Sequence, residues 1–450
     1  MKRSFKSVLP ITGLVLIACM TAGCGGKSTA ADPAGEPSKQ AAVVEQPKPV
    51  TIRVGAMTYT LPKEDFQKYM AEPLKAKYPH ITLEYVDMMT NKAKMLDEMI
   101  TAGTVPDLLY DGITNYYSMG ATGLPMDMTQ LAQKYKYNFN VFDSSLVNNV
   151  KMISSKGEML FFPFFDILFV THYNKGIFDK FGVNYPKDNM TWEETLQLAN
   201  RFNRTEDNLQ YQGLNMNGLN RIPMQLTLPL VDRATDKGVI QSNPGWKTMF
   251  EMLKPAYVTP DGKALTIFGG KNQFIQKRNL AIFPDLTLLG ASNVDLEKSV
   301  NEGLEWDMVT YPVFKNNPVT VGGFMDGFVI TKTSKNPDDA FKVLMNVASE
   351  SVQLRMTREG KMTVLNDTKI REQIMADNPL AKGKNIKAIF ALPRPGSPYP
   401  FTRFDSMAMG TYNTKAFTPY VQGKNDLNTL LREADETLNQ QIEEEKRNGR

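Results

Sequence analysis

The sequence predicts an α/β protein with two lobes, and three observations support this. From Val50 onward, short apolar strand segments alternate with helical segments of about 10 to 15 residues, which indicates βαβ units and a parallel sheet. The chain has 450 residues, whereas a single hydrophobic core stops growing at about 250 to 300 residues. Hydrophobic residues make up 42% of the chain and aromatic residues 10%, a composition typical of a globular protein.

The start of the chain predicts export. Lys2, Arg3 and Lys6 form a basic segment, and an apolar run follows from Val8 to Met20. This run is too short to form a transmembrane helix, which needs about 20 apolar residues. We therefore expect a signal peptide over residues 1–23.

Small residues at 21–23 lead into Cys24, and this segment resembles the lipobox of bacterial lipoproteins. The resemblance implies cleavage before Cys24 and its modification with diacylglycerol and palmitate, which would anchor the protein to the outside of the cell membrane. Thr21 departs from the pattern, where Leu, Val or Ile is usual, and Cys19 ends an alternative lipobox with a shorter apolar run. We favour Cys24 because a polar stretch follows it. An ordinary signal peptide without lipid is the remaining alternative.

Residues 24–49 predict a flexible tether. They are rich in Gly, Ser, Ala, Pro, Glu and Lys, so they cannot bury enough apolar surface to offset the entropy lost on ordering. The chain has 52 basic and 48 acidic residues, and loss of the signal peptide leaves 49 basic ones. This balance excludes the basic footprint of a nucleic-acid-binding protein.

The folded part begins with clearly marked elements. We expect strands over 50–54, 81–86 and 108–110 and helices over 63–78 and 92–102. Pro79 ends the first helix, while Gly103 and Pro106 follow the second as a C-cap pattern requires. Further on, Thr191 and Glu194 form a capping box around Trp192. We expect Trp192 and Trp306 to pack in the core, together with most of the phenylalanines around Pro163.

Several motifs occur in an order that is similar to one family. They are 105–108 (VPDL), 123–128 (GLPMDM), 157–163 (GEMLFFP), 172–178 (HYNKGIF), 182–194 (GVNYPKDNMTWEE), 306–312 (WDMVTYP) and 327–340 (GFVITKTSKNPDDA). Together they resemble the type 1 extracellular solute-binding proteins of ABC importers, the family of maltose-binding protein, over residues 50 to about 445. The chain departs from the family at 277–281 (KRNLA), where Gly usually precedes the small residue.

The resemblance implies a two-lobed, periplasmic-binding-protein-like fold of type II, with mixed sheets flanked by helices and a ligand cleft between the lobes. It implies chain crossings near 163–167, 280–283 and 327–330. One lobe would contain residues 50–163 and 283–327, and the other residues 167–280 and 331–450.

The candidate ligand-binding residues follow early strands or lie beside the implied crossings. They are Tyr59, Asp111, Asp166, Asp285, Gly323, Phe324 and Asp326. Carboxylates suit a polyhydroxyl ligand, since an ionised Asp accepts two or more hydrogen bonds, and aromatic rings cover the apolar face of a sugar.

No catalytic or metal-binding motif is present in the sequence. The two histidines lack partners at metal-ligand spacing, both cysteines lie in the signal region, and H-E-x-x-H, G-x-S-x-G, phosphate-loop and G-x-G-x-x-G patterns are missing. We therefore expect no cofactor, no metal and no enzyme.

The resemblance implies a monomeric, membrane-anchored protein that captures a solute and delivers it to an ABC permease by hinge closure. An oligosaccharide or sugar derivative is the favoured solute, and a peptide, polyamine or phosphate ester is the alternative. A surface lipoprotein enzyme acting on carbohydrate and an accessory that presents ligand to a sensor are the other functions to separate.

Overall fold

The structure is a computed structural model that describes residues 47–447 apart from residues 59, 91, 121, 155, 220, 291–293 and 396–398. The expected signal peptide, both lipidation candidates and nearly all of the tether lie outside the described residues, and so does the candidate Tyr59. In the described part of the chain, every helix is too short or too polar to cross a membrane.

One five-stranded sheet, called the first sheet below, has the strand order β2-β1-β3-β12-β4. Its strands are β1 (Val50–Ala56), β2 (Ile81–Asp87), β3 (Leu108–Gly112), β4 (Phe162–Asp166) and β12 (Met325–Ile330). β1 runs parallel to β2 and β3, whereas β12 runs antiparallel to β3 and β4. The predicted parallel pairing of the early strands is therefore confirmed.

Helices from residues 63–151 and from residues 337–371 cover the first sheet. They are α1 (Lys63–Phe66), η1 (Gln67–Ala71), α2 (Glu72–Lys77), α3 (Lys92–Ala102), α4 (Ile113–Gly120), α5 (Thr129–Lys134), η2 (Phe139–Val141), α6 (Ser144–Lys151), α13 (Pro337–Val347), α14 (Glu350–Glu359) and α15 (Thr368–Arg371). α1, η1 and α2 form one continuous helical run, which confirms the predicted helix. α13 packs against α2 and β1, so late and early segments share one core.

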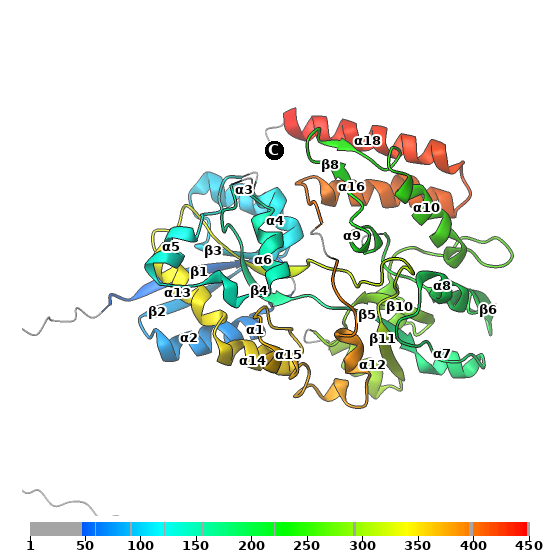
Figure 1. The fold of residues 1–450 in the computed structure, drawn as a ribbon, viewed down its shortest axis with the longest axis horizontal. Coiled ribbons are helices and arrows are strands. Elements are labelled where there is room, and N and C mark those ends of the chain that lie inside the picture. Colours follow the sequence, from blue (N-terminus) through cyan, green and yellow to red (C-terminus); the bar gives the residue numbers. More distant parts are fainter. Residues whose placement is uncertain are drawn as a thin grey trace, which may run out of the picture. The chain divides into compact units, whose positions relative to one another are not determined.

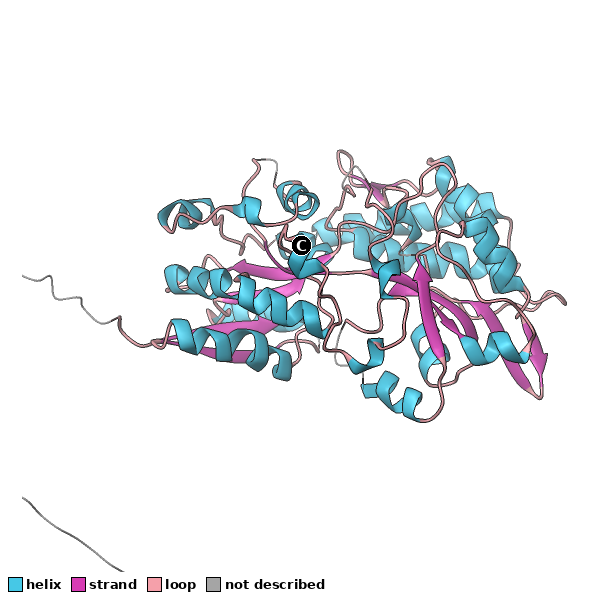
Figure 2. Ribbon diagram, turned by 60° about the horizontal axis from the view of Figure 1, so that its bottom comes forward, coloured by secondary structure: helices cyan, strands magenta, loops and turns pink. Residues whose placement is uncertain are grey.

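The second sheet has the order β11-β5-β10-β7-β6. Its strands are β5 (Phe169–Asn174), β6 (Arg204–Glu206), β7 (Leu209–Leu214), β10 (Leu280–Leu286) and β11 (Trp306–Thr310). β5 is antiparallel to both β10 and β11, while β7 is parallel to β10. A short hairpin of β8 (Val231–Asp232) and β9 (Lys237–Gly238) lies apart from this sheet. Figure 2 shows the two large sheets as separate groups of strands joined by loops.

The remaining helices pack with the second sheet or with one another. They are α7 (Lys175–Lys180), α8 (Trp192–Asn200), α9 (Ile222–Gln225), α10 (Pro244–Leu253), η3 (Lys254–Tyr257), α11 (Gly270–Ile275), α12 (Val294–Asn301), η4 (Pro379–Ala381), η5 (Ile386–Ile389), α16 (Asp405–Thr411), η6 (Tyr412–Phe417), α17 (Thr418–Val421) and α18 (Leu427–Arg447). α18, drawn red in Figure 1, lies beside η6 and β9. The last helix of the chain therefore packs against the hairpin at 231–238, near the middle of the sequence.

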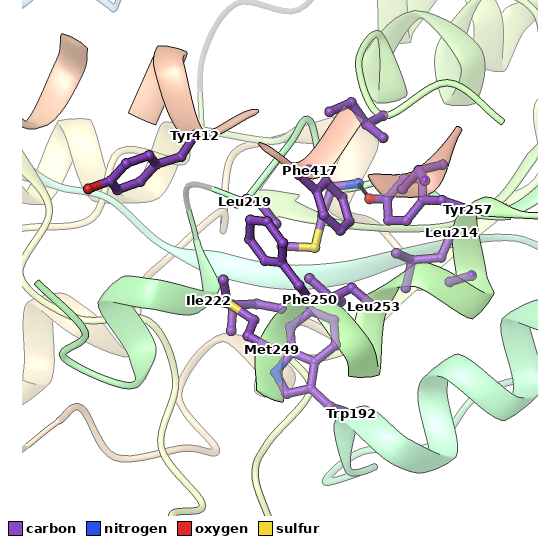
Figure 3. Close-up of a cluster of buried hydrophobic side chains, with 14 of the residues drawn as sticks. Trp192, Leu214, Leu219, Ile222, Met249, Phe250, Leu253, Tyr257, Tyr412 and Phe417 are labelled. Carbon is purple, nitrogen blue, oxygen red and sulfur yellow. Dashed lines mark hydrogen bonds between the residues drawn. The ribbon is translucent and has the colours of Figure 1, made fainter. Parts of the chain in front are cut away.

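The core beside the second sheet is rich in aromatic side chains, as Figure 3 shows around Phe250 and Phe417. Their ring centroids are 5.0 Å apart. Trp192 is 1% exposed, and its Nε1 donates to Gln225 Oε1 at 2.9 Å. The capping box of Thr191 and Glu194 is present at the start of α8. The predicted core roles of Trp192, Trp306 and the phenylalanines around Pro163 are confirmed, because all of these side chains are buried.

The crossings between the sheets differ from the expected ones. The chain passes from β4 to β5 at 167–168, which agrees with the first expected crossing. It returns from β11 to β12 through 311–324. The crossing expected at 280–283 is wrong, because these residues lie inside β10, and the one expected at 327–330 is wrong, because they lie inside β12.

The expected lobe boundaries need a matching correction. Within 50–163, β1, β2 and β3 belong to the first sheet; within 167–280, β5, β6 and β7 belong to the second, and β8 and β9 form their separate hairpin. β10 and β11, however, pair with β5 in the second sheet, although residues 283–327 were expected in the first lobe. α13 and α14 belong to the core of the first sheet, although they fall within 331–450. The apolar sequence of such a strand is compatible with either sheet, and its sheet is determined by the strand with which it pairs.

Candidate ligand-binding cleft

The two sheets bring acidic side chains to the edges where the chain crosses between them. Asp166 ends β4 and pairs in register with Met325, while Asp326 pairs with Gly112, next to Asp111. All three aspartates therefore lie at the same end of the strands of the first sheet, which is called its edge below. In the second sheet, β5 begins three residues after Asp166 and pairs with the end of β10, which places Asp285 at its edge.

A cavity of about 570 Å³ lies at this junction. Its wall comes from α6 and the residue before it, the end of β4 and the crossing after it, the second crossing at 320–323, and the segment 389–395. The wall is completed by Phe169, Met224, Met362, Arg371 and Tyr399. Elements of both cores thus meet around one space, which is where a two-lobed binding protein would hold a ligand.

Two ion pairs line the cavity. Arg394 donates to Asp166 Oδ2 through Nη2 and to Ser145 Oγ at 3.1 Å through Nη1. Arg371 Nη2 donates to Asp143 Oδ2 at 2.6 Å. The Asp166 side chain is 1% exposed, so its charge depends on Arg394 for compensation.

The carboxylates of these pairs are held differently. Asp143 caps α6, and its Oδ1 accepts a hydrogen bond from Ser145 N at 2.8 Å. Burial raises the pKa of Asp143, but the hydrogen bonds from Ser145 and Arg371 outweigh it and lower this pKa to about 2. Burial raises the pKa of the Asp166 carboxyl above its ordinary value, while the guanidinium of Arg394 acts in the opposite direction.

Gly323 lies on the cavity wall, and its backbone explains why glycine occurs here. Its φ is +82°, a left-handed conformation that favours glycine. A Cβ at this position would lie 2.5 Å from Asn149 Nδ2, so a side chain would displace Asn149. Asn149, on α6, also lines the cavity.

A separate polar cluster lies at the edge of the second sheet. Asp285 accepts hydrogen bonds from Arg221 Nε at 2.9 Å and from Asn217 Nδ2 at 2.8 Å. The guanidinium of Arg221 lies 5.3 Å from the ring centroid of Phe169 and 5.9 Å from that of Phe324. Phe169 also contributes to the cavity wall, so its ring connects this cluster with the cavity.

At the edge of the first sheet, Asp326 lies among hydroxyl groups. Its Oδ2 accepts hydrogen bonds from Thr60 Oγ1 and, at 3.2 Å, from the Tyr110 hydroxyl. Burial raises the pKa of Asp326 to about 6, and the nearby charge of Asp111 adds to this rise, whereas the Thr60 hydrogen bond opposes it. Asp111 Oδ1 accepts a hydrogen bond from Asn115 Nδ2 at 2.9 Å.

Of the candidates from the sequence, Asp166 and Gly323 contribute to the cavity wall. Asp111, Asp285, Phe324 and Asp326 are buried and do not line it. Sequence reasoning missed Asp143, Arg371, Phe390, Arg394 and Tyr399. Asp143 carries a usable signal, because it stands directly before two serines at the start of a helix. Arg371 ends the short helix α15, and the other three lie in a region without a regular pattern.

The profile of the bacterial extracellular solute-binding proteins matches residues 59–354. A search of curated proteins gives no match.

Many solved structures share the fold. An ABC substrate-binding protein from Listeria monocytogenes in complex with cycloalternan is 15% identical, with a TM-score of 0.70, over 88% of this chain and 99% of that one. The maltose/maltodextrin-binding domain from Bdellovibrio bacteriovorus bound to maltotriose is 16% identical, with a TM-score of 0.62, over 88% and 100%. The sugar-binding protein MalE from Xanthomonas citri is 16% identical, with a TM-score of 0.65, over 88% and 98%. The predicted two-lobed fold is confirmed.

Proposed function

Since this chain belongs to the bacterial extracellular solute-binding protein family, we propose that it captures an oligosaccharide in the cavity between its two sheets and delivers it to an ABC importer. Members of this family bind solutes outside the cytoplasm and are binding proteins rather than enzymes. The proposal adds to this membership the kind of solute and the place where it binds.

The composition of the cavity wall supports a sugar ligand. A volume of about 570 Å³ lies within the range of about 300 to 1,000 Å³ found for small-molecule sites. Asn148, Asn149, Ser144 and Ser145 bring amide and hydroxyl groups to one side. Phe390 on the wall is 44% exposed, and a ring left in solvent beside polar groups suits the apolar face of a sugar. This pairing of an exposed ring with hydrogen-bonding groups is the observation that carries the proposal.

The solved structures support the same solute class. Cycloalternan and maltotriose are the ligands of the proteins from Listeria monocytogenes and Bdellovibrio bacteriovorus. We infer a saccharide for this chain because it shares their fold and also presents sugar-compatible groups in its own cavity.

Membrane retention is the second part of the proposal. A monomer linked by lipid on Cys24 and by the tether over residues 24–49 would stay near the permease while its folded part remains mobile. Stable retention needs more than one acyl chain. A Cys24→Ser variant is expected to appear in the medium or to stay unprocessed, and Cys19→Ser is the control. If only Cys19→Ser is released, the assignment to Cys24 fails.

A thermal-shift screen of the mature chain tests the solute class. Neutral, acidic and amino oligosaccharides are compared with peptides, polyamines and phosphate esters. A ligand at about 100 times its dissociation constant adds about 2.7 kcal/mol to the free energy of unfolding. We expect stabilisation by at least one saccharide. Stabilisation by a peptide or a polyamine, with every saccharide inactive, would contradict the proposal.

A further inference from the structure

We infer that the cavity selects an uncharged saccharide over acidic sugars and amino sugars of the same length, an inference that rests on the proposed function. The selection follows from how the charged side chains on the cavity wall are paired, and from which polar groups remain for a ligand.

The charges on the wall cancel. Among the described residues that line the cavity, four are charged, namely Asp143, Asp166, Arg371 and Arg394. They form two ion pairs, Arg394 with Asp166 and Arg371 with Asp143. The cavity therefore has no net charge to offer an ionic ligand.

A charged ligand would weaken one of these pairs. A carboxylate on the sugar that bound Arg394 would share its guanidinium with Asp166, whose side chain is 1% exposed. Two carboxylates would then depend on one cation, and the buried Asp166 would lose part of its compensating charge, which is unfavourable. An ammonium group that bound Asp166 would share this carboxylate with Arg394 and place two cations beside one anion. An uncharged ligand leaves both pairs intact.

One neutral hydroxyl on the wall is available to a ligand. Thr320 Oγ1 is buried and lacks a hydrogen-bond partner within the described part of the chain, and Thr320 lines the cavity. A ligand hydroxyl on this wall can supply the partner that a buried polar atom in a native protein nearly always has. A hydroxyl both donates and accepts hydrogen bonds, as does the hydroxyl of a sugar.

Calorimetric titration of the mature chain with probes matched in length and linkage tests the inference. Maltotriose is compared with trigalacturonate, both α-1,4-linked, and cellotriose with the β-1,4-linked glucosamine trimer. We expect the neutral member of a pair to bind more tightly by about tenfold or more, because like charges and unpaired buried charges are strongly disfavoured.

The possible results separate the two claims. Equal or tighter binding of a charged probe overturns this inference and leaves the proposed function standing. If none of the four probes binds, this inference fails, and the proposed function fails with it once the wider saccharide screen is also negative.

Charge-shifted variants test the cause of the selection. The pair of Arg371 with Asp143 is suitable because its side chains are 27% and 17% exposed, so a change there endangers folding less than a change at Asp166. Arg371→Gln should shift the preference about tenfold toward the glucosamine trimer, and Asp143→Asn should shift it by a similar factor toward trigalacturonate. The double variant Arg371→Gln/Asp143→Asn restores neutrality and should restore the neutral preference. Unchanged preferences in both single variants would overturn the inference.

Discussion

The two sheets bring a buried carboxylate to the same junction but surround it with different chemistry. Asp285 at the edge of the second sheet binds the guanidinium of Arg221 and the amide of Asn217. Asp326 at the edge of the first sheet accepts hydrogen bonds from the hydroxyls of Thr60 and Tyr110. A guanidinium adds a compensating charge to its hydrogen bonds, whereas hydroxyls satisfy hydrogen bonds without compensating charge. The stability of the first site should therefore depend on the protonation of Asp326, whereas the second site should depend on one ion pair.

The largest expected effect is at Arg221. Replacing it in Arg221→Met leaves the Asp285 side chain, which is 8% exposed, without a counter-charge. We expect a loss of about 3 to 5 kcal/mol in the free energy of unfolding, measured by urea denaturation. The control is Arg355→Met, since Arg355 is 45% exposed and forms only surface pairs, which contribute about 0 to 1 kcal/mol. Equal losses in both variants would show that burial of the pair of Arg221 with Asp285 does not increase its contribution to the free energy of unfolding.

Asp326→Asn should have a smaller effect of opposite sign. The pKa of Asp326 is raised to about 6 from an ordinary 3.8, so the native state binds this proton more tightly than the unfolded state does. Protonation of Asp326 therefore contributes to the free energy of unfolding; this contribution is fully present below about pH 4 and is lost as pH rises through about 6. The variant should therefore exceed the wild type by about 2 to 3 kcal/mol at pH 8.

The difference between Asp326→Asn and the wild type should vanish near pH 4, where both side chains are neutral. Urea denaturation at pH 4, 6 and 8 measures it. A difference that stays constant over this range would contradict the assigned pKa.

A smaller effect is expected on ligand affinity at Thr320. Thr320→Val removes a hydroxyl that has no partner within the described residues, so the unliganded melting temperature should change little. Affinity for a bound saccharide should fall by about 0.5 to 1.5 kcal/mol, the usual contribution of one hydrogen bond. Thr171→Val is the matched control, because Thr171 Oγ1 is also buried without a partner there but Thr171 does not line the cavity. Equal losses of affinity in both variants would remove Thr320 from the site.

More of the fold than of the candidate site could be predicted from the sequence. Alternation of strands and helices indicates the parallel arrangement of β1 to β3, and the capping box indicates the start of α8. The sheet to which β10 belongs could not be predicted, because its apolar residues fit either core and its pairing with β5 is a tertiary choice. Asp166 could be predicted because the family resemblance implies a chain crossing near 163–167. Arg394 and Tyr399 lie outside helices and strands, in the segment between η5 and α16. Only the tertiary packing of this segment brings them to the cavity.

The central claim is that a saccharide binds in the cavity against the ring of Phe390, and one titration tests it most directly. The saccharide that raises the melting temperature most is titrated into the wild type, Phe390→Ala and Phe268→Ala. The two phenylalanines are 44% and 46% exposed, but only Phe390 lines the cavity. We predict that Phe390→Ala weakens binding about threefold to tenfold, the worth of one aromatic contact, and that Phe268→Ala leaves binding unchanged. Unaltered binding in Phe390→Ala, or an equal loss in both variants, would contradict the account.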